Sequence, residues 1–249
     1  MTEQLVYGFH AVHALLEKRM RPIKKVYVNK ERDDSRIEDI LKLTKQHHIQ
    51  VEPLTLAEMS KRFSDHVHQG VVASVGSLPV FTESDIKQLL TRFTPPYLIL
   101  ILDGVTDPHN LGACLRSADA ASVNFVVIPK DKSAGLSPTV SKVACGAAES
   151  MPLVSVTNLV RVMEMLKEVG IWVYGAAGEA TSSLYQLDCQ ASMAFVLGAE
   201  GKGLRRLTRE HCDGLFSLPM YGTVSSLNVS VATGICLYET VRQRSLKEL

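Results

Sequence analysis

The chain has 249 residues, which is enough for one or two domains at about 150 residues per domain. Apolar residues make up 46% and charged residues 21%, so extended disorder is excluded, and no apolar run approaches the roughly 20 residues that a membrane span needs. The net charge of +1 excludes a generally basic nucleic-acid binder, and five cysteines without a CxxC pair or a signal peptide favour reduced thiols in the cytoplasm.

The first part of the chain alternates between helix and strand patterns. Helices are predicted over residues 8–19, from 35 onward and over 56–63, and strands over 23–28, 49–51 and 71–75. We interpret residues 1–76 as a small N-terminal α/β domain. Residues 77–96 end in Thr94-Pro95-Pro96, a strong stop signal, and are expected to form a linker with a short helix over 84–92.

From residue 97 the strand and helix patterns strengthen. The aliphatic run over 98–102 is typical of a strand that is buried on both faces of a parallel sheet. Further strands are predicted at 125–128, 153–156, 172–176, 194–197 and 215–218, and helices at 110–121, 138–145, 158–169 and 228–244. This alternation predicts an α/β domain over 97–249 with helices on both faces of a parallel sheet.

Ligands of such sheets bind beyond the carboxyl ends of the strands, and three polar turns follow predicted strands there. The first turn, residues 103–112, contains Asn110 and leads into a helix with Arg116. An amide and a guanidinium at these positions can bind a phosphate or orient a hydroxyl. Equally, Asp107 or Asn110 caps the helix and Arg116 faces solvent.

The second turn, Gly198-Ala199-Glu200-Gly201-Lys202-Gly203, has glycines that let the backbone approach a ligand, although a simple tight turn has the same pattern. Its spacing matches neither the dinucleotide fingerprint nor a P-loop. The third turn runs from Leu218-Pro219-Met220 to a helix start with Ser226 and Asn228. Free N–H groups at such a start bind anions, unless Ser225 or Ser226 merely caps the helix.

Two local basic clusters stand out against the nearly neutral whole. They contain Lys18, Arg19, Arg21, Lys24 and Lys25 in the first domain, and Arg205, Arg206 and Arg209 in the second. Each cluster can bind the phosphates of a nucleic acid or can simply be solvated surface. Histidines and cysteines show no metal-ligand spacing, so no metal is predicted.

Taken in order, the three turns resemble the signature motifs of the SpoU (TrmH) family of RNA ribose 2′-O-methyltransferases. The matching residues are Asn110, Gly112 and Arg116, then Gly198, Glu200, Gly201 and Gly203, then Leu218-Pro219-Met220 with Ser226, Leu227 and Asn228. Residues 7–12 and 68–71 are similar to those of two-domain bacterial members, so the resemblance covers nearly the whole chain.

The resemblance implies a SPOUT (α/β knot) catalytic domain over 97–249 with a deep trefoil knot, and an N-terminal RNA-binding domain similar to ribosomal protein L30e. It also implies a homodimer, with no metal and no membrane. S-adenosylmethionine is the implied cofactor, held around Gly198, Gly201, Leu218, Met220, Leu227 and Asn228. The implied catalytic residues are Arg116, Asn110, Glu200, Ser226 and Asn228.

The implied reaction is methylation of the ribose of a guanosine in the peptidyl-transferase loop of 23S rRNA, with the basic cluster at 18–25 contacting RNA. The alternatives are a tRNA or another rRNA as the substrate, a non-catalytic ribosome-assembly factor that binds RNA, and a small-molecule enzyme of the dinucleotide type. The enzyme hypothesis requires the 198–203 and 218–228 loops to fold against each other, with Arg116 at the rim of their pocket.

Overall fold

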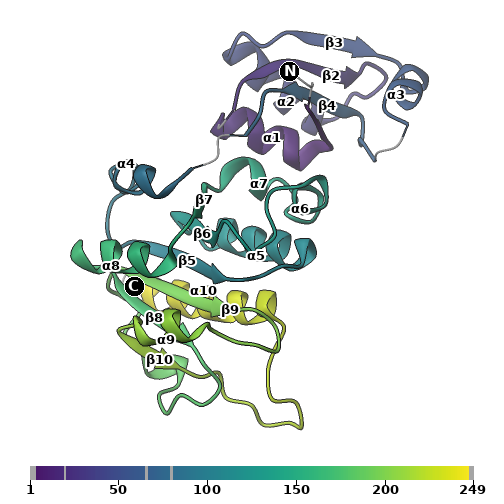
Figure 1. Ribbon diagram of the computed structural model, residues 1–249. Helices are drawn as coiled ribbons and strands as arrows, with labels where there is room; N and C mark the ends of the chain where they lie inside the picture. Colours follow the sequence, from purple (N-terminus) through teal and green to yellow (C-terminus); the bar gives the residue numbers. More distant parts are fainter. Residues whose placement is uncertain (1–3, 20, 65–66, 79–80, 247–249) are drawn as a thin grey trace. The chain divides into compact units, whose positions relative to one another are not determined.

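The computed structural model describes residues 4–19, 21–64, 67–78 and 81–246 (Figure 1). The chain forms two compact units, one comprising Met1–Pro79 with Cys145–Ser150 and the other Val80–Ala144 with Met151–Leu249. Each unit has its own sheet and its own hydrophobic core. Within the described ranges, no helix is long and apolar enough to cross a membrane.

The first unit is a four-stranded sheet with helices on both faces. Its elements are β1 (Gln4–Tyr7), α1 (Phe9–Lys18), β2 (Ile23–Asn29), α2 (Ser35–Gln46), β3 (Val51–Leu54), α3 (Leu56–Arg62), β4 (Val71–Val75) and the short α7 (Ala147–Ser150). The strand order is β1-β4-β2-β3, with β4 antiparallel to both of its neighbours. Apolar residues of α1 and α2 pack on one face of the sheet, and those of α3 pack on the other.

The second unit is a six-stranded parallel sheet of order β10-β8-β9-β5-β6-β7. Its elements are η1 (Glu83–Asp85), α4 (Ile86–Leu90), β5 (Leu98–Asp103), α5 (Pro108–Ala120), β6 (Phe125–Pro129), α6 (Pro138–Val143), β7 (Leu153–Val156), α8 (Leu159–Glu168), β8 (Trp172–Ala176), η2 (Leu184–Gln186), β9 (Met193–Gly198), α9 (Arg206–Glu210), β10 (Gly214–Phe216) and α10 (Val229–Ser245). The predicted parallel sheet is confirmed, and each strand predicted for this sheet coincides with an observed one to within two residues.

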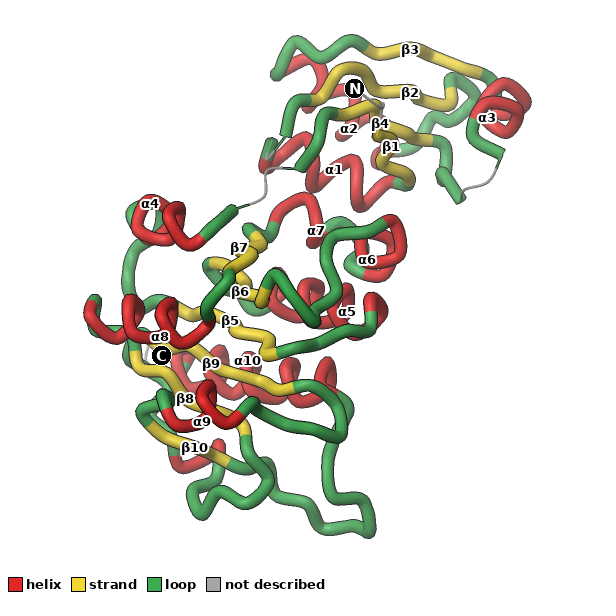
Figure 2. The backbone as a smooth tube through the Cα atoms, in the orientation of Figure 1, coloured by secondary structure: helices red, strands yellow, loops and turns green. Residues whose placement is uncertain are grey.

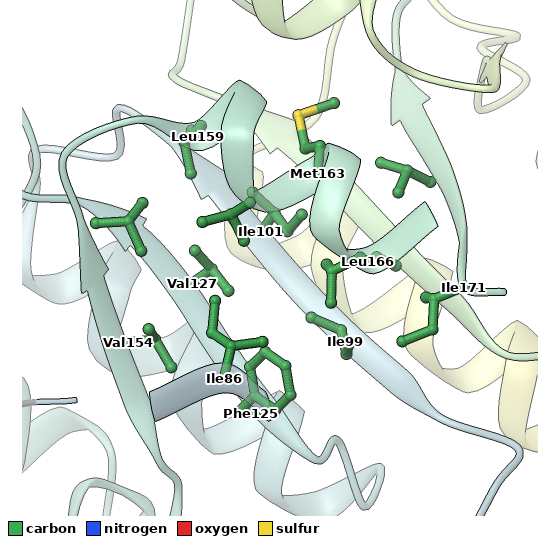
Figure 3. Close-up of a cluster of buried hydrophobic side chains, with 14 of the residues drawn as sticks. Ile86, Ile99, Ile101, Phe125, Val127, Val154, Leu159, Met163, Leu166 and Ile171 are labelled. Atoms are coloured by element: carbon green, nitrogen blue, oxygen red, sulfur yellow. The ribbon is translucent and has the colours of Figure 1, made fainter. Parts of the chain in front are cut away.

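Helices cover both faces of this parallel sheet. On one face, Ile99, Ile101 and Val127 lie beneath apolar side chains of α8 such as Leu159 and Leu166 (Figure 3). On the other face, α10 packs along β9 and against α5 (Figure 1). All six residues of β5 are buried, as the continuous aliphatic run predicted.

Of the segment predicted as a linker, residues 77–96, the part from residue 81 onward belongs to the second compact unit. Ile86, Leu89 and Leu90 of α4 are buried in the core under the sheet, and Phe81 forms a β-bridge with Val154. The helix predicted at 84–92 is present as η1 and α4, and its apolar residues are spaced to cover a core.

The last turn of α10 is fastened to the chain around the start of β5. The guanidinium of Arg244 donates to the carbonyl oxygens of Pro96 and Cys189 at 3.1 Å and to those of Tyr97 and Ala191 at 2.9 Å. Burial lowers the pKa of this guanidinium, because it removes hydration from the charged form. The hydrogen bonds fix the end of α10 on the sheet.

Glu83, in η1, connects the segment before α4 to the start of α8 by hydrogen bonds. One of its oxygens accepts hydrogen bonds from the hydroxyl and the N–H of Thr157 at 2.9 Å and from the N–H of Asn158 at 3.0 Å, and the other pairs with Arg161. Burial raises the pKa of the Glu83 carboxyl, but the hydrogen bonds outweigh burial and the pKa is lowered overall. The charged form of Glu83 therefore stabilises the fold.

Glu83→Gln should lower the free energy of unfolding by about 2 kcal/mol at pH 7, because hydrogen bonds to a charged group are lost. The folded-state pKa lies below the ordinary value of 4.5. The wild-type advantage is therefore complete above that pH and disappears as the pH falls through the folded-state pKa. Urea unfolding from pH 7 down to pH 3 measures this difference. Glu168→Gln, at the exposed end of α8, is the control; equal losses in both variants would contradict the role of Glu83.

Candidate functional site

The candidate site lies where the loops after β5, β9 and β10 come together. β5 and β9 are neighbours in the middle of the sheet, and their last residues, Asp103 and Gly198, are partners in register. The loops after these two strands therefore start side by side. The segment after β10 is a long loop that leads to α10 (Figure 2).

A hydrogen-bond network joins the three loops. The Oε1 atom of Glu200 accepts from Nδ2 of Asn110 at 2.9 Å and from Nδ2 of Asn228 at 2.6 Å. The two amides also contact each other, since Nδ2 of Asn228 donates to Oδ1 of Asn110 at 3.0 Å. The structure thus brings together one predicted catalytic residue from each sequence motif.

The orientation of the Asn228 amide is fixed by the start of α10. Its Oδ1 accepts from the N–H of Ser230 at 2.8 Å and from the hydroxyl of Ser230 at 2.6 Å. Asn228, rather than Ser225 or Ser226, is therefore the N-cap of this helix. Because the cap uses the oxygen, the NH₂ group is left to face Glu200.

The network rests on the packing of α5 against α10. Asp107 caps α5 by accepting from the N–H of His109 at 2.8 Å, and Asn110 lies in the first turn with 8% of its surface exposed. Between the middle of α5 and the second turn of α10, Sγ of Cys114 lies 3.4 Å from Oγ1 of Thr233. Burial raises the pKa of the Cys114 thiol to about 11, so the thiol is neutral and structural at pH 7.

The loop after β9 folds back over the end of its own strand. A Cβ atom on Gly198 would lie 2.1 Å from the carbonyl carbon of Gly203, so no larger residue fits there. The N–H of Gly203 donates to the carbonyl of Ala199 at 2.9 Å, and Gly201 and Gly203 have φ values of 73° and 63°. The glycine spacing therefore serves a tight turn, which was one of the two interpretations of these glycines; the other was close approach of the backbone to a ligand.

Asp103 and Arg205 form a contact that the sequence did not predict. The Asp103 carboxylate ends β5 and accepts from the N–H of Arg205 at 2.9 Å and from its Nε at 2.5 Å. The sequence signal was a single acid at the end of an aliphatic strand, but nothing in the local pattern indicated its partner.

The other predicted residues differ in how exposed they are. Arg116 is exposed on α5, about 120° around the helix axis from Asn110 at 3.6 residues per turn. Ser226 is exposed in the third loop. Leu218 and Met220 are half-buried, and Leu227 is 37% exposed. The loop therefore presents apolar surface to its surroundings.

The second and third loops have free bonding capacity for a nucleoside-like cofactor. Residues 200–202 and 218–227 form no backbone–backbone hydrogen bond with the part of the chain that the structure describes. The positions where Gly201 and Gly203 would carry a Cβ are open. Exposed N–H and C=O groups beside apolar side chains suit an adenosine group. Among the described residues, no three His, Cys, Asp or Glu side chains cluster as metal ligands do.

The first basic cluster lies on the first unit, beside a hollow of about 590 Å³ that Arg19 and Ile23 help to line. Lys18, Arg19 and Lys24 are exposed, whereas Lys25 is half-buried and its Nζ lies 2.9 Å from Glu52.

Arg21 requires a correction to the predicted RNA contacts. Its side chain is buried, and it forms a bidentate pair with Glu149 with N–O distances of 2.6 and 2.8 Å. Because this pair consumes the guanidinium inside the fold, Arg21 does not present its charge to a nucleic acid. In the second cluster, Arg206 pairs with Glu210, and Arg209 pairs with Glu179.

Comparisons with known proteins give consistent matches along the chain. A model described as the SpoU rRNA Methylase family matches residues 97–238, and one described as RNA 2'-O ribose methyltransferase substrate binding matches residues 5–80. The 23S rRNA (guanosine-2'-O-)-methyltransferase RlmB of Pseudomonas putida is 54% identical over 97% of both chains. The same enzyme of Escherichia coli K12 is 52% identical over 97% of this chain and 99% of its own.

Solved structures share the fold of the whole chain. The SpoU methyltransferase AviRb from Streptomyces viridochromogenes has a TM-score of 0.78 at 24% identity, covering 98% of this chain and 91% of its own; it has also been solved in complex with AdoMet. A putative RNA methyltransferase of the TrmH family from Porphyromonas gingivalis has a TM-score of 0.73 at 27% identity, covering 97% and 90%. These likenesses identify the second unit as a SPOUT fold.

Two substitutions at Asn228 test the network. Asn228→Ser keeps a good helix cap but removes the NH₂ donor, whereas Asn228→Asp keeps the cap and places a second carboxylate against Glu200. The Asp variant should be less stable than the Ser variant by about 1 kcal/mol at pH 7, because like charges then meet at the surface. Urea unfolding measures the difference, and adding Glu200→Gln to the Asp variant should abolish it. Equal stability of the two single variants would contradict the network.

Proposed function

This chain belongs to the SpoU rRNA methylase family, and we propose that it methylates the ribose 2′-oxygen of a guanosine in 23S rRNA. The proposal is supported by relatives at 52–54% identity along 97% of the chain, which carry that activity in their names. The observation that carries it is the Glu200 network, which assembles one residue from each of the three motif loops. The target guanosine lies in the peptidyl-transferase loop, and the enzyme acts in the cytoplasm, where its RNA is made.

S-adenosylmethionine is the methyl donor. When it is bound, it supplies an electrophilic methyl group on a positively charged sulfur. Gly198 and Gly201 on the second loop would hold it through backbone groups. On the third loop, backbone groups and apolar contacts would come from Leu218, Met220, Leu227 and Asn228. The open space at Gly201 and the uncommitted backbone of residues 218–227 fit this group.

The chemical step is an in-line displacement at the methyl carbon. The ribose 2′-oxygen forms the new bond to carbon, the carbon–sulfur bond breaks with its electron pair left on sulfur, and the hydroxyl proton passes to a phosphate oxygen or to water. Arg116 does not accept that proton, because a guanidinium has a pKa above about 12. Instead it binds the RNA phosphate or the negative charge that develops on oxygen. Asn110, Glu200, Ser226 and Asn228 orient the reacting groups.

The active form is a homodimer whose interface includes the third loop and α10. Tyr221 is 98% exposed and Val224 is 61% exposed in that loop, and Val231 and Tyr238 on α10 are 50% and 52% exposed. The last two are seven residues apart and therefore share one face of the helix. Large apolar side chains gathered on a surface are typical of an interface, and a second copy of the chain covers them through a two-fold axis.

Arg116→Ala should lower the rate of methyl transfer at least 100-fold while changing the affinity for S-adenosylmethionine less than threefold, because the residue acts on the RNA rather than on the cofactor. Transfer of labelled methyl groups to 23S rRNA measures the first quantity and calorimetry the second. Arg116→Lys keeps the charge but not the planar fork, and should retain intermediate activity.

Mapping the product distinguishes the alternatives. A single linkage in 23S rRNA that resists alkaline cleavage locates the target nucleotide, whereas label in tRNA supports a different substrate within the family. Binding of S-adenosylmethionine by the wild type without any product supports the assembly-factor hypothesis. Near wild-type transfer by Arg116→Ala would refute the role given to that residue.

Neutralising Lys18, Arg19, Lys24 and Lys25 together to Gln should weaken RNA binding and flatten its dependence on salt. Each phosphate contact that is lost reduces the slope of log K against log salt by about 0.7 to 0.9. Lys25 should contribute least, since it already pairs with Glu52. Filter binding at several salt concentrations gives the slope. Lys61→Gln on α3, on the opposite face of the sheet from α1, is the control, and an unchanged slope in the quadruple variant would mean that the cluster is only solvated.

A further inference from the structure

Asp103 is a buried carboxylate for which the proposed chemistry has no use. It is the last residue of β5, in the middle of the sheet, and none of its side-chain surface is exposed. Burying a carboxylate is costly unless it is well paired, because burial removes its hydration. Both of its oxygens accept from Arg205, Oδ2 from the N–H at 2.9 Å and Oδ1 from Nε at 2.5 Å.

Arg205 ends the loop that Gly198 begins. Within this loop, the N–H of Gly203 donates to the carbonyl oxygen of Ala199 and so closes a tight turn. Leu204 then packs against the hydrophobic core, and the contact to Asp103 fastens the far end of the loop to β5. If this end lifted, the Asp103 carboxylate would lose both bonds and stay buried without a partner, which costs more than the bonds themselves. The loop is therefore held to the strand beside its own.

Glu200 lies between the two fastened ends of this loop. The position of its Oε1 atom relative to Asn110 and Asn228 consequently depends on how the loop is anchored. Arg205 is also the N-cap residue of α9, but its guanidinium has no acceptor with which to cap that helix, and it contacts Asp103 instead. The side chain serves the loop before it rather than the helix after it.

We propose that the Asp103–Arg205 pair is a latch that holds the 198–205 loop in the shape that binds S-adenosylmethionine. Both members are positioning residues, since they act through the backbone of the loop and through Glu200. The latch rests on the proposed function for the identity of the ligand, but its effect on the loop is a property of the protein without any ligand.

Arg205→Ala tests the latch, with its neighbour Arg206→Ala as the matched control. Arg206 has a side chain that is 77% exposed and pairs along α9 with Glu210, so its loss should leave the loop unchanged. Calorimetry should show S-adenosylmethionine binding at least 10-fold more weakly to Arg205→Ala and within twofold of wild type to Arg206→Ala. In steady-state assays, the KM for S-adenosylmethionine should rise, while kcat at saturation and the KM for RNA stay within threefold.

Amide hydrogen exchange in the ligand-free protein supplies a second readout. Exchange of the Gly203 amide, which donates to Ala199, and of the residue 205 amide, which donates to Asp103, should be at least 10-fold faster in Arg205→Ala than in wild type, and unchanged in Arg206→Ala. If Arg205→Ala fails to fold, Arg205→Lys takes its place, because it keeps the cation and the backbone donor but loses the Nε contact; it should show the same changes with smaller size. Asp103→Asn keeps the shape and one acceptor, and should also give an intermediate loss of affinity.

The outcomes separate the latch from the proposed function. A folded Arg205→Ala that binds S-adenosylmethionine like wild type, with unchanged exchange, overturns the latch. A raised KM for RNA with unchanged cofactor affinity also overturns it, because Arg205 then contacts the substrate. Failure of the wild type to methylate RNA overturns the proposed function alone, since the exchange experiment needs neither cofactor nor RNA and decides the latch by itself.

Discussion

One carboxylate oxygen determines how the site is assembled. Oε1 of Glu200 accepts hydrogen bonds from an amide 90 residues before it and from another 28 residues after it. Two NH₂ donors can share one oxygen only if both helix starts that carry them are in place, so the network reports the correct folding of three loops at once. Because Glu200 and Asn228 are exposed, the network orients the three side chains more than it stabilises the fold. The geometry of the site therefore depends on everything that fixes α5, α10 and the loop after β9.

Helix α10 connects this network to the body of the second unit. Its 17 residues span about 25 Å at 1.5 Å per residue. Asn228 caps its start in the site, Thr233 contacts α5 one turn later, and Arg244 binds four carbonyls at its end. A helix that is bonded at both ends and packed along one side cannot rotate about its axis. This explains how an exposed asparagine next to a long loop is held in position to donate to Glu200.

Local pattern predicted most of the fold, and its failures have physical causes. The buried strands of the parallel sheet were found because strands covered on both faces are continuously aliphatic. The short β1 was missed, since its four residues lie at the edge of the sheet and show only one buried position. The helix at residues 84–92 was predicted from the sequence, but its burial in the core of the second unit was not. Whether Ile86 and Leu89 cover a core depends on a sheet whose first strand begins only at Leu98.

The site shows the same division between local and distant information. Residue types and spacings identified the three loops, because glycine and capping residues act on their immediate neighbours. They did not identify which charged side chains form ion pairs with each other. The sequence suggested that Arg21 is a surface cation, but in the structure it is buried and paired with Glu149, 128 residues away. The partner of Asp103, Arg205, was likewise not evident from the sequence. The trefoil knot is the extreme case, since threading is a property of the whole chain path and of no local pattern, so the knot stays a prediction from family resemblance. The roles of charged residues are thus the least predictable part of such a site, because they depend on partners that are distant in the sequence and become neighbours only in the folded chain.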